Sequence, residues 1–124
     1  MSTAMVIDDS RAMRMILSRS LKKLGYDVCM AGDGKEALDI LHEQAPELAF
    51  LLVDWNMPEM TGIEFVQHLR TIPTYSSVPL MMVTTETEPE QMLRAFEAGA
   101  NEYVMKPFTE DIIESKLRLM GVLD

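Results

Sequence analysis

The sequence predicts an α/β domain in which five parallel strands form one sheet with helices on both faces. Short apolar runs alternate five times with segments whose apolar residues recur at helical spacing, as in strand–helix units joined by right-handed crossovers. The run Leu48–Val53 is apolar at both parities, which is typical of a strand covered on both faces. A length of 124 residues suits one such domain, so we expect residues 1–124 to fold as a single unit.

The first unit begins with the apolar run Met5–Ile7, which is the expected first strand. Ser10 then suits the cap of a helix, because its side-chain oxygen can accept a hydrogen bond from a free backbone N–H group. Apolar residues continue at helical spacing to Leu24, and Gly25 is expected to end the helix. The second strand is expected over Asp27–Ala31.

A turn at residues 32–34 leads from the second strand into a helix expected over Lys35–Gln44, which Pro46 ends. Leu48–Val53 is the expected third strand, and its mixed apolar character indicates the middle of the sheet. The third helix is expected over Gly62–Leu69.

The fourth strand is expected over Val78–Val83. The helix after it is expected over Pro89–Ala98, with proline in its first turn and Gly99 at its end. Glu102–Met105 is the expected fifth strand. Thr109 suits the cap of the last helix, whose acidic first turn favours the positive end of the helix dipole.

The composition excludes several classes of protein. A formal net charge of −9 argues against nucleic-acid binding, which needs an excess of lysine and arginine. The apolar runs are far too short to span a bilayer. Cys29 is the only cysteine, so no internal disulfide is expected and the chain is expected to be cytoplasmic.

Positive charge is concentrated between residues 10 and 26, a stretch that contains no acidic residue, although the chain has 20 elsewhere. This stretch is either a solvated helix face or a docking surface for an acidic partner. Its five basic residues are Arg11, Arg14, Arg19, Lys22 and Lys23.

Polar residues that carry chemistry follow the expected strands, never precede them: Asp8, Asp9, Asp54, Thr84 and Lys106. The carboxyl ends of parallel strands lie at one edge of the sheet, where ligands bind. Each residue alone also suits a turn or a helix start. Together, carboxylates that repel one another favour a cation such as Mg²⁺, and a lysine and a hydroxyl can hold phosphoryl oxygens. The set therefore predicts phosphoryl chemistry on a carboxylate nucleophile.

Three motifs extend this pattern along the chain: Val6-Ile7-Asp8-Asp9-Ser10, Asp54-Trp55-Asn56-Met57-Pro58 and Lys106-Pro107-Phe108-Thr109. With these motifs the chain resembles the receiver domains of two-component response regulators from end to end. The second motif and the run from 100 to 108 are most similar to the chemotaxis regulators of that family. The resemblance implies a flavodoxin-like (βα)5 sandwich with the strand order 2-1-3-4-5.

The resemblance also implies roles for residues around the acidic cluster. Asp54 is expected to be the phosphoacceptor and to take a phosphoryl group from a sensor histidine kinase. Asp9 and Asp54 are expected to contact Mg²⁺ directly, Asp8 through water and Asn56 through its backbone carbonyl. Asn56 and Glu86 flank the site and are expected to influence how fast water removes the phosphoryl group.

Further residues are assigned to signalling by the same resemblance. Lys106 and Thr84 are expected to bind the phosphoryl oxygens, and Pro107 is expected to follow a cis peptide bond. Tyr103 is expected to swing inward when Thr84 is drawn to the phosphate.

Twelve methionines are a high number for this length, and core packing is their ordinary explanation. The helix over Pro89–Ala98 favours a second explanation, because its apolar stripe is wider than one buried face needs. The resemblance places four residues near a surface for output partners: Met92, Phe96, Tyr103 and Met105.

These observations predict a monomeric, single-domain response regulator, with only residues 121–124 after the last helix and no output domain. It is expected to catalyse its own phosphorylation and dephosphorylation and not to act as an enzyme on other substrates. The expected output partner is a flagellar motor switch protein, and a phosphate sink or phosphorelay intermediate is the alternative. A phosphatase in which Asp8 is the nucleophile is a further alternative, but this chain lacks the Asp-x-Asp spacing of such enzymes. A flavin carrier is disfavoured because no loop suited to a flavin phosphate follows the first strand.

Overall fold

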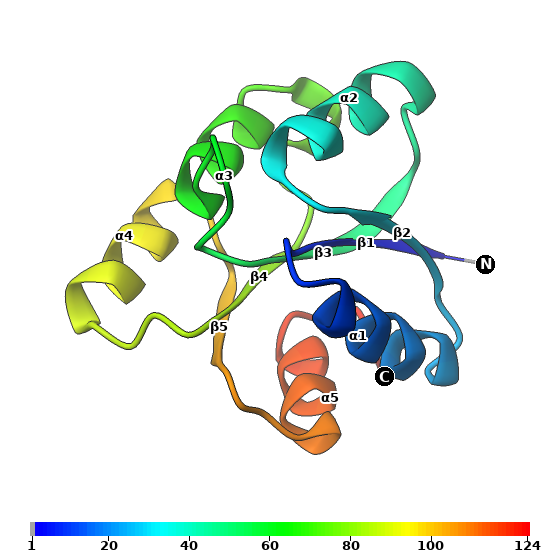
Figure 1. Cartoon of the computed structure of the whole chain (residues 1–124). Helices are drawn as coiled ribbons and strands as arrows, with labels where there is room; N and C mark the ends of the chain where they lie inside the picture. The colour runs from blue at the N-terminus through cyan, green and yellow to red at the C-terminus, as the bar shows by residue number, and fades with distance from the viewer. Residues whose placement is uncertain (1) are drawn as a thin grey trace.

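A sheet of five parallel strands runs through the middle of the fold, in the order β2-β1-β3-β4-β5 (Figure 1). The computed structural model describes residues 2–124. Every neighbouring pair of strands is parallel, so the carboxyl ends of all five strands lie at the same edge. The fold class and the strand order are confirmed. The strands are β1 (Thr3–Ile7), β2 (Asp27–Ala31), β3 (Leu48–Val53), β4 (Leu80–Thr84) and β5 (Glu102–Met105).

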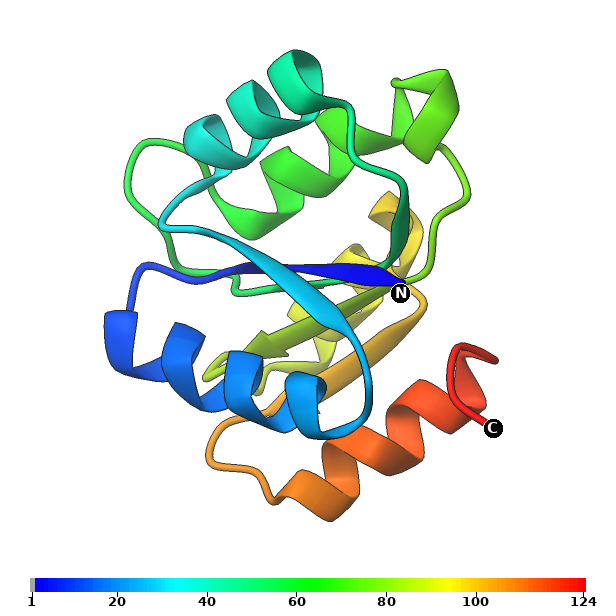
Figure 2. The ribbon, with the colours of Figure 1, turned by 90° about the vertical axis from the view of Figure 1, so that its right-hand side faces the viewer.

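Helices cover both faces of this sheet, with α1 and α5 on one face and the other three on the opposite face (Figures 1 and 2). Within residues 2–124, no helix is long and apolar enough to cross a membrane. The helices are α1 (Arg11–Lys23), α2 (Gly34–Gln44), α3 (Gly62–Arg70), α4 (Pro89–Ala98) and α5 (Glu110–Leu119).

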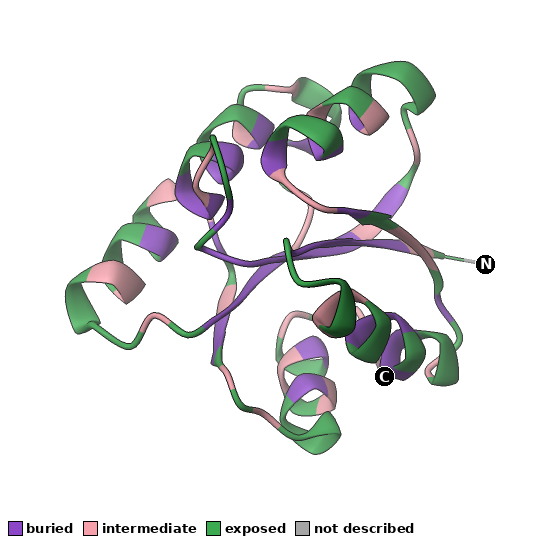
Figure 3. Ribbon diagram, in the orientation of Figure 1, coloured by how far each residue is buried: buried purple, intermediate pink, exposed green. Residues whose placement is uncertain are grey.

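Two apolar cores result, one on each face of the sheet, because successive strand residues point to opposite faces. Phe50 and Leu52 of β3 belong to the core under α1 and α5. Leu51 and Val53 belong to the core under α2, α3 and α4. All four are at most 1% exposed, which confirms the prediction that this strand is covered on both faces (Figure 3).

The helix caps follow the local sequence closely. The Ser10 side chain accepts a hydrogen bond from the N–H of Met13, and Thr109 caps α5 in the same way. Gly99 ends α4 with φ at 122°, a conformation that side-chain-bearing residues rarely adopt. The predicted caps of α1 and α5 and the predicted end of α4 are therefore confirmed.

Several bounds differ from the sequence prediction by one or two residues, and one short element was not expected. Strand β1 begins two residues earlier than expected, at Thr3, because it pairs there with β2. Strand β4 begins two residues later, at Leu80, whose N–H donates instead to the side chain of Asn101. A short 3-10 turn over Pro73–Tyr75 was not expected, and the buried ring of Tyr75 anchors it.

Candidate functional site

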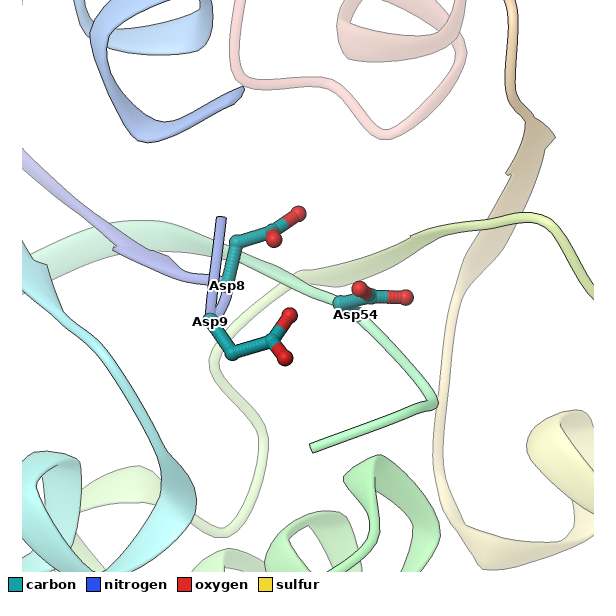
Figure 4. A group of neighbouring side chains, drawn as sticks. All are labelled: Asp8, Asp9 and Asp54. Atoms are coloured by element: carbon teal, nitrogen blue, oxygen red, sulfur yellow. The ribbon is translucent and has the colours of Figure 1, made fainter. Parts of the chain in front are cut away.

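Three carboxylates meet beyond the carboxyl ends of β1 and β3 (Figure 4). Asp8, Asp9 and Asp54 each offer an oxygen that lies within 4.8 Å of the other two. Asp8 and Asp54 are 1% and 6% exposed, whereas Asp9 faces solvent. The structure therefore brings together the acidic residues that the sequence placed at strand ends, with one open side.

Lys106 lies between two of these carboxylates. Its Nζ donates to Asp8 Oδ2 at 2.8 Å and to Asp54 Oδ2 at 3.1 Å. The backbone N–H of Lys106 donates to the carbonyl of Thr84 at 2.8 Å, which ties the residue to the end of β4. The Lys106–Pro107 peptide is cis, as the resemblance implies. The two hydrogen bonds of Nζ thus hold the positive charge of Lys106 between Asp8 and Asp54.

The second oxygen of each buried carboxylate is held by backbone. Asp8 Oδ1 accepts from the N–H of Ser10 at 2.9 Å, and Asp54 Oδ1 accepts from the N–H of Trp55 at 2.7 Å. The guanidinium of Arg14 donates to the backbone carbonyl of Asp8 at 2.6 Å. Sequence analysis assigned Arg14 only to the basic stretch, because this contact depends on how α1 packs beside β1.

Burial and charge act against each other in this cluster. Burial raises the pKa of Asp8, the hydrogen bonds from Lys106 and Ser10 lower it, and the charge of Asp54 raises it further. Burial alone would lower the pKa of Lys106, but the two carboxylates outweigh burial and raise it. The expected repulsion between carboxylates is present, but burial raises the pKa of Asp8 more than the charge of Asp54 does. The lysine stays positive at neutral pH.

The acidic cluster fits a magnesium ion by its donor atoms and their spacing. Mg²⁺ prefers oxygen ligands and is usually bound through one or two carboxylates together with waters. Asp8, Asp9 and Asp54 offer three carboxylate oxygens that lie within 4.8 Å of one another. The side-chain amide of Asn56 donates to Glu86 Oε1 at 3.2 Å, and metal binding by the backbone carbonyl of Asn56 stays a prediction.

Trp55 provides a direct readout of metal binding, because it is the only tryptophan and its backbone N–H donates a hydrogen bond to Asp54. Adding Mg²⁺ alone is expected to change its fluorescence, with half of the change at millimolar concentration, roughly as for a mostly hydrated ion. Asp9→Asn, which removes the exposed carboxylate, is the matched control and should weaken the response. Emission that stays flat up to tens of millimolar Mg²⁺ in the unaltered chain counts against the site.

The two expected switch residues both contact Glu86. Thr84 is fully buried, and its Oγ1 accepts from the N–H of Glu86 at 3.2 Å. Tyr103 is 6% exposed and donates its hydroxyl to the carbonyl of Glu86 at 2.8 Å. The tyrosine therefore occupies an inward position in this structure, and the loop after β4 connects the two residues.

The raised pKa values of the three tyrosines predict how the stability of the fold changes in alkali. Burial is the largest cause that raises the pKa of Tyr26 and Tyr75, and it raises the pKa of Tyr103 to about 12. An unfolded tyrosine ionises near pH 10, so above about pH 10 the native chain binds more protons than the unfolded chain and loses stability. We expect tyrosinate absorbance to rise only together with unfolding followed by circular dichroism. A tyrosine that ionises near pH 10 in the folded chain would contradict this.

The expected output surface is partly exposed. Phe96 is 43% exposed and Met105 is 45% exposed, and their neighbour Leu93 reaches 59%. Met92 is half-buried, and Tyr103, also expected here, is buried because its hydroxyl is bonded inside. Core packing nevertheless explains other methionines, since Met5, Met81 and Met82 are fully buried. The apolar stripe of α4 is thus wider than its buried face, as its sequence indicated.

Two of the five basic residues between 10 and 26 form polar contacts within the fold, and the other three are exposed to solvent. Arg14 is bonded to the acidic site, and Lys23 forms an exposed ion pair of 3.4 Å with Glu110. Arg11, Arg19 and Lys22 are exposed. A docking role for this stretch stays a prediction.

Comparisons with known proteins agree with this geometry. The family model described as "Response regulator receiver domain" matches residues 4–118. A "Chemotaxis protein CheY homolog" of Campylobacter jejuni is 42% identical over 114 residues, which cover 91% of this chain and 87% of that protein. "Chemotaxis protein CheY1" of Helicobacter pylori is 39% identical over 117 residues, 94% of each chain. The solved structure of the Vibrio cholerae chemotaxis protein CheY4 superposes with a TM-score of 0.90 at 36% identity, and covers 97% of this chain and 98% of that one.

Proposed function

Because the chain belongs to the response regulator receiver domain family, we propose that its Asp54 accepts a phosphoryl group from the histidine of a sensor kinase. The observation that carries the proposal is the position of Lys106, whose ammonium lies 2.8 Å from Asp8 and 3.1 Å from Asp54. A fixed positive charge beside a carboxylate favours a reaction in which negative charge accumulates there.

The chemistry needs no base at the acceptor, because an ionised carboxylate is already a nucleophile. An oxygen of Asp54 forms a bond to phosphorus while the phosphorus–nitrogen bond of the donor imidazole breaks. The electron pair of that bond stays on the nitrogen, and the product is an acyl phosphate. Asp54 is the more accessible of the two buried carboxylates, at 6% exposed against 1% for Asp8, which favours it as the nucleophile.

Lys106 and Thr84 are proposed to hold the transferred group. The ammonium of Lys106 can follow the charge from the carboxylate of Asp54 to the phosphoryl oxygens without leaving the site. At the neighbouring strand end, Thr84 Oγ1 accepts from the N–H of Glu86, and its O–H is proposed to donate to a phosphoryl oxygen. When bound by Asp8, Asp9 and Asp54, Mg²⁺ supplies further positive charge for the phosphoryl oxygens.

Self-catalysed loss of the phosphoryl group is part of the proposal. The side-chain amide of Asn56, two residues after Asp54, donates to Glu86 Oε1 at 3.2 Å, and this contact is exposed to solvent. The pair is proposed to set how readily water reaches phosphorus.

The relatives are named as chemotaxis proteins, which supports a chemotaxis pathway as the setting. A cytoplasmic location and a flagellar motor switch protein as the output partner are part of the proposal. The apolar residues exposed on α4 and β5 support a partner surface. Binding of the purified motor-switch subunit, with and without phosphorylation of Asp54, separates this role from that of a phosphate sink. Equal binding in both states would leave the sink or relay function.

Thr84→Ala tests whether phosphorylation and signalling can be separated. The variant is expected to be labelled on Asp54 by acetyl phosphate, because the nucleophile and Lys106 remain. It is expected to bind the output partner no better when phosphorylated, since the contact that moves the loop after β4 is lost. Thr84→Ser, which keeps the hydroxyl, is the matched control. A normal gain in partner binding by Thr84→Ala would remove Thr84 from the switch.

A further inference from the structure

Arg94 on α4 lies over the indole ring of Trp55, the residue directly after Asp54. The guanidinium carbon is 5.8 Å from the ring centroid, within the range of a cation–π contact. Arg94 also donates to Gln91 Oε1 at 3.1 Å, which helps to orient the guanidinium. The contact joins the loop that carries the acceptor to the helix that carries the exposed Leu93 and Phe96.

Trp55 is tightly placed between the acceptor and α3. The backbone N–H of Trp55 donates to Asp54 Oδ1 at 2.7 Å, and the backbone carbonyl of Trp55 accepts from the N–H of Gly62 at 2.8 Å. A side chain at Gly62 would collide with the backbone carbonyl of Asp54, so only glycine allows this approach. The indole is 6% exposed. A new charge on Asp54 therefore acts directly on the hydrogen bond that positions Trp55.

The start of α4 has few other attachments, whereas its end is firmly held. Its N-cap residue, Glu88, makes no side-chain capping bond, and among the described residues of α4 only Ala95 is buried. At the other end, the guanidinium of Arg70 donates to the carbonyl of Gly99 at 2.6 and 3.2 Å. The Arg94–Trp55 contact lies in the middle of α4 and is therefore one of the contacts that set the position of this helix beside the loop after β3.

We propose that Arg94 is a positioning residue that couples Asp54 to α4 through Trp55. This inference rests on the proposed function of Asp54 and adds the route by which the charge of the phosphoryl group reaches Leu93 and Phe96. The contact holds α4 against the loop after β3, and a shift of Trp55 changes that hold. A cation–π contact of this kind changes an equilibrium only a few-fold, so Arg94 is expected to bias the position of α4 and not to lock it.

The test compares Arg94→Gln, Arg94→Lys and Arg19→Gln with the unaltered chain. Arg19 is an exposed arginine on α1, which lies on the face of the sheet opposite α4, so its variant is a control matched in charge. Without any phosphoryl analogue, Trp55 emission is expected to change in Arg94→Gln and not in Arg19→Gln. Arg94→Lys keeps a cation over the ring, so its Trp55 emission is expected to stay close to that of the unaltered chain.

The coupling itself is measured by amide NMR with saturating beryllofluoride and Mg²⁺. In Arg94→Gln, the signals of Asp54 and Thr84 are expected to shift as far as in the unaltered chain. The signals of Leu93 and Phe96 are expected to shift by at most about half as much as in the unaltered chain. Equal shifts in α4, or unchanged Trp55 emission, overturn the inference. If beryllofluoride leaves Asp54 unshifted in the unaltered chain, the proposed function and with it the coupling are overturned, while the emission experiment still decides the contact.

Discussion

Replacing Asp54 by asparagine is expected to abolish acid-labile phosphorylation of the protein by acetyl phosphate. An amide cannot form an acyl phosphate, so the loss should be complete and not a reduction in rate. Asparagine has nearly the shape of aspartate, and Lys106 keeps its contact with Asp8, so the variant is expected to stay folded. The label is quantified with isotopic acetyl phosphate, and mass spectrometry locates the modified residue.

Two variants make this result specific. Lys106→Ala is expected to allow phosphorylation and to blunt the response, because the lysine stabilises and senses the charge but does not form the bond. Asp9→Asn removes an exposed carboxylate of the same cluster and should slow labelling without preventing it. Intact label on Asp54→Asn would move the acceptor to Asp8 or Asp9 and would restore the phosphatase interpretation.

Replacing Arg70 by alanine is expected to cause the largest loss of stability among the proposed variants. Its guanidinium, at the far end of the sheet from Asp54, donates to the carbonyls of Tyr75, Val78 and Gly99 and to the Asn101 side chain. Burial lowers the pKa of Arg70, but the group stays charged at neutral pH. Hydrogen bonds from a charged group contribute about 1.5–3 kcal/mol each and are not additive, so we expect a loss of about 3 kcal/mol.

Thermal unfolding measures this effect, and a decrease of Tm by roughly 10 °C is expected for a domain of this size. Arg70→Lys is expected to recover little, because one ammonium cannot reach all these acceptors. Arg118→Ala is the matched control, since Arg118 also donates to side-chain and backbone oxygens, those of Glu114 and Asp124, but is half exposed on α5. A Tm for Arg70→Ala within about 2 °C of the unaltered chain, roughly the effect of an ordinary surface substitution, would show that the cluster contributes little.

The sequence by itself determined the alternation of strands and helices and the edge at which the site lies. The strand Leu48–Val53 could be predicted because burial on two faces demands apolar residues at both parities. Asp8 and Asp54 could be placed together because parallel strands bring all their carboxyl ends to one edge. The strand order followed from the family resemblance and not from the periodicity. Local periodicity is therefore informative wherever a residue's environment depends on its own strand or helix.

Only the tertiary structure decided which side chains meet across elements. Lys106 lies between Asp8 and Asp54, and Arg94 reaches Trp55, because the twist of the sheet and the packing of α4 bring together residues distant in sequence. Nothing in its local sequence distinguishes Arg94 or Arg70 from a solvated helix arginine. The reason is physical: a side chain's partners depend on the relative positions of whole elements, whereas sequence periodicity reports only which face of one element is buried.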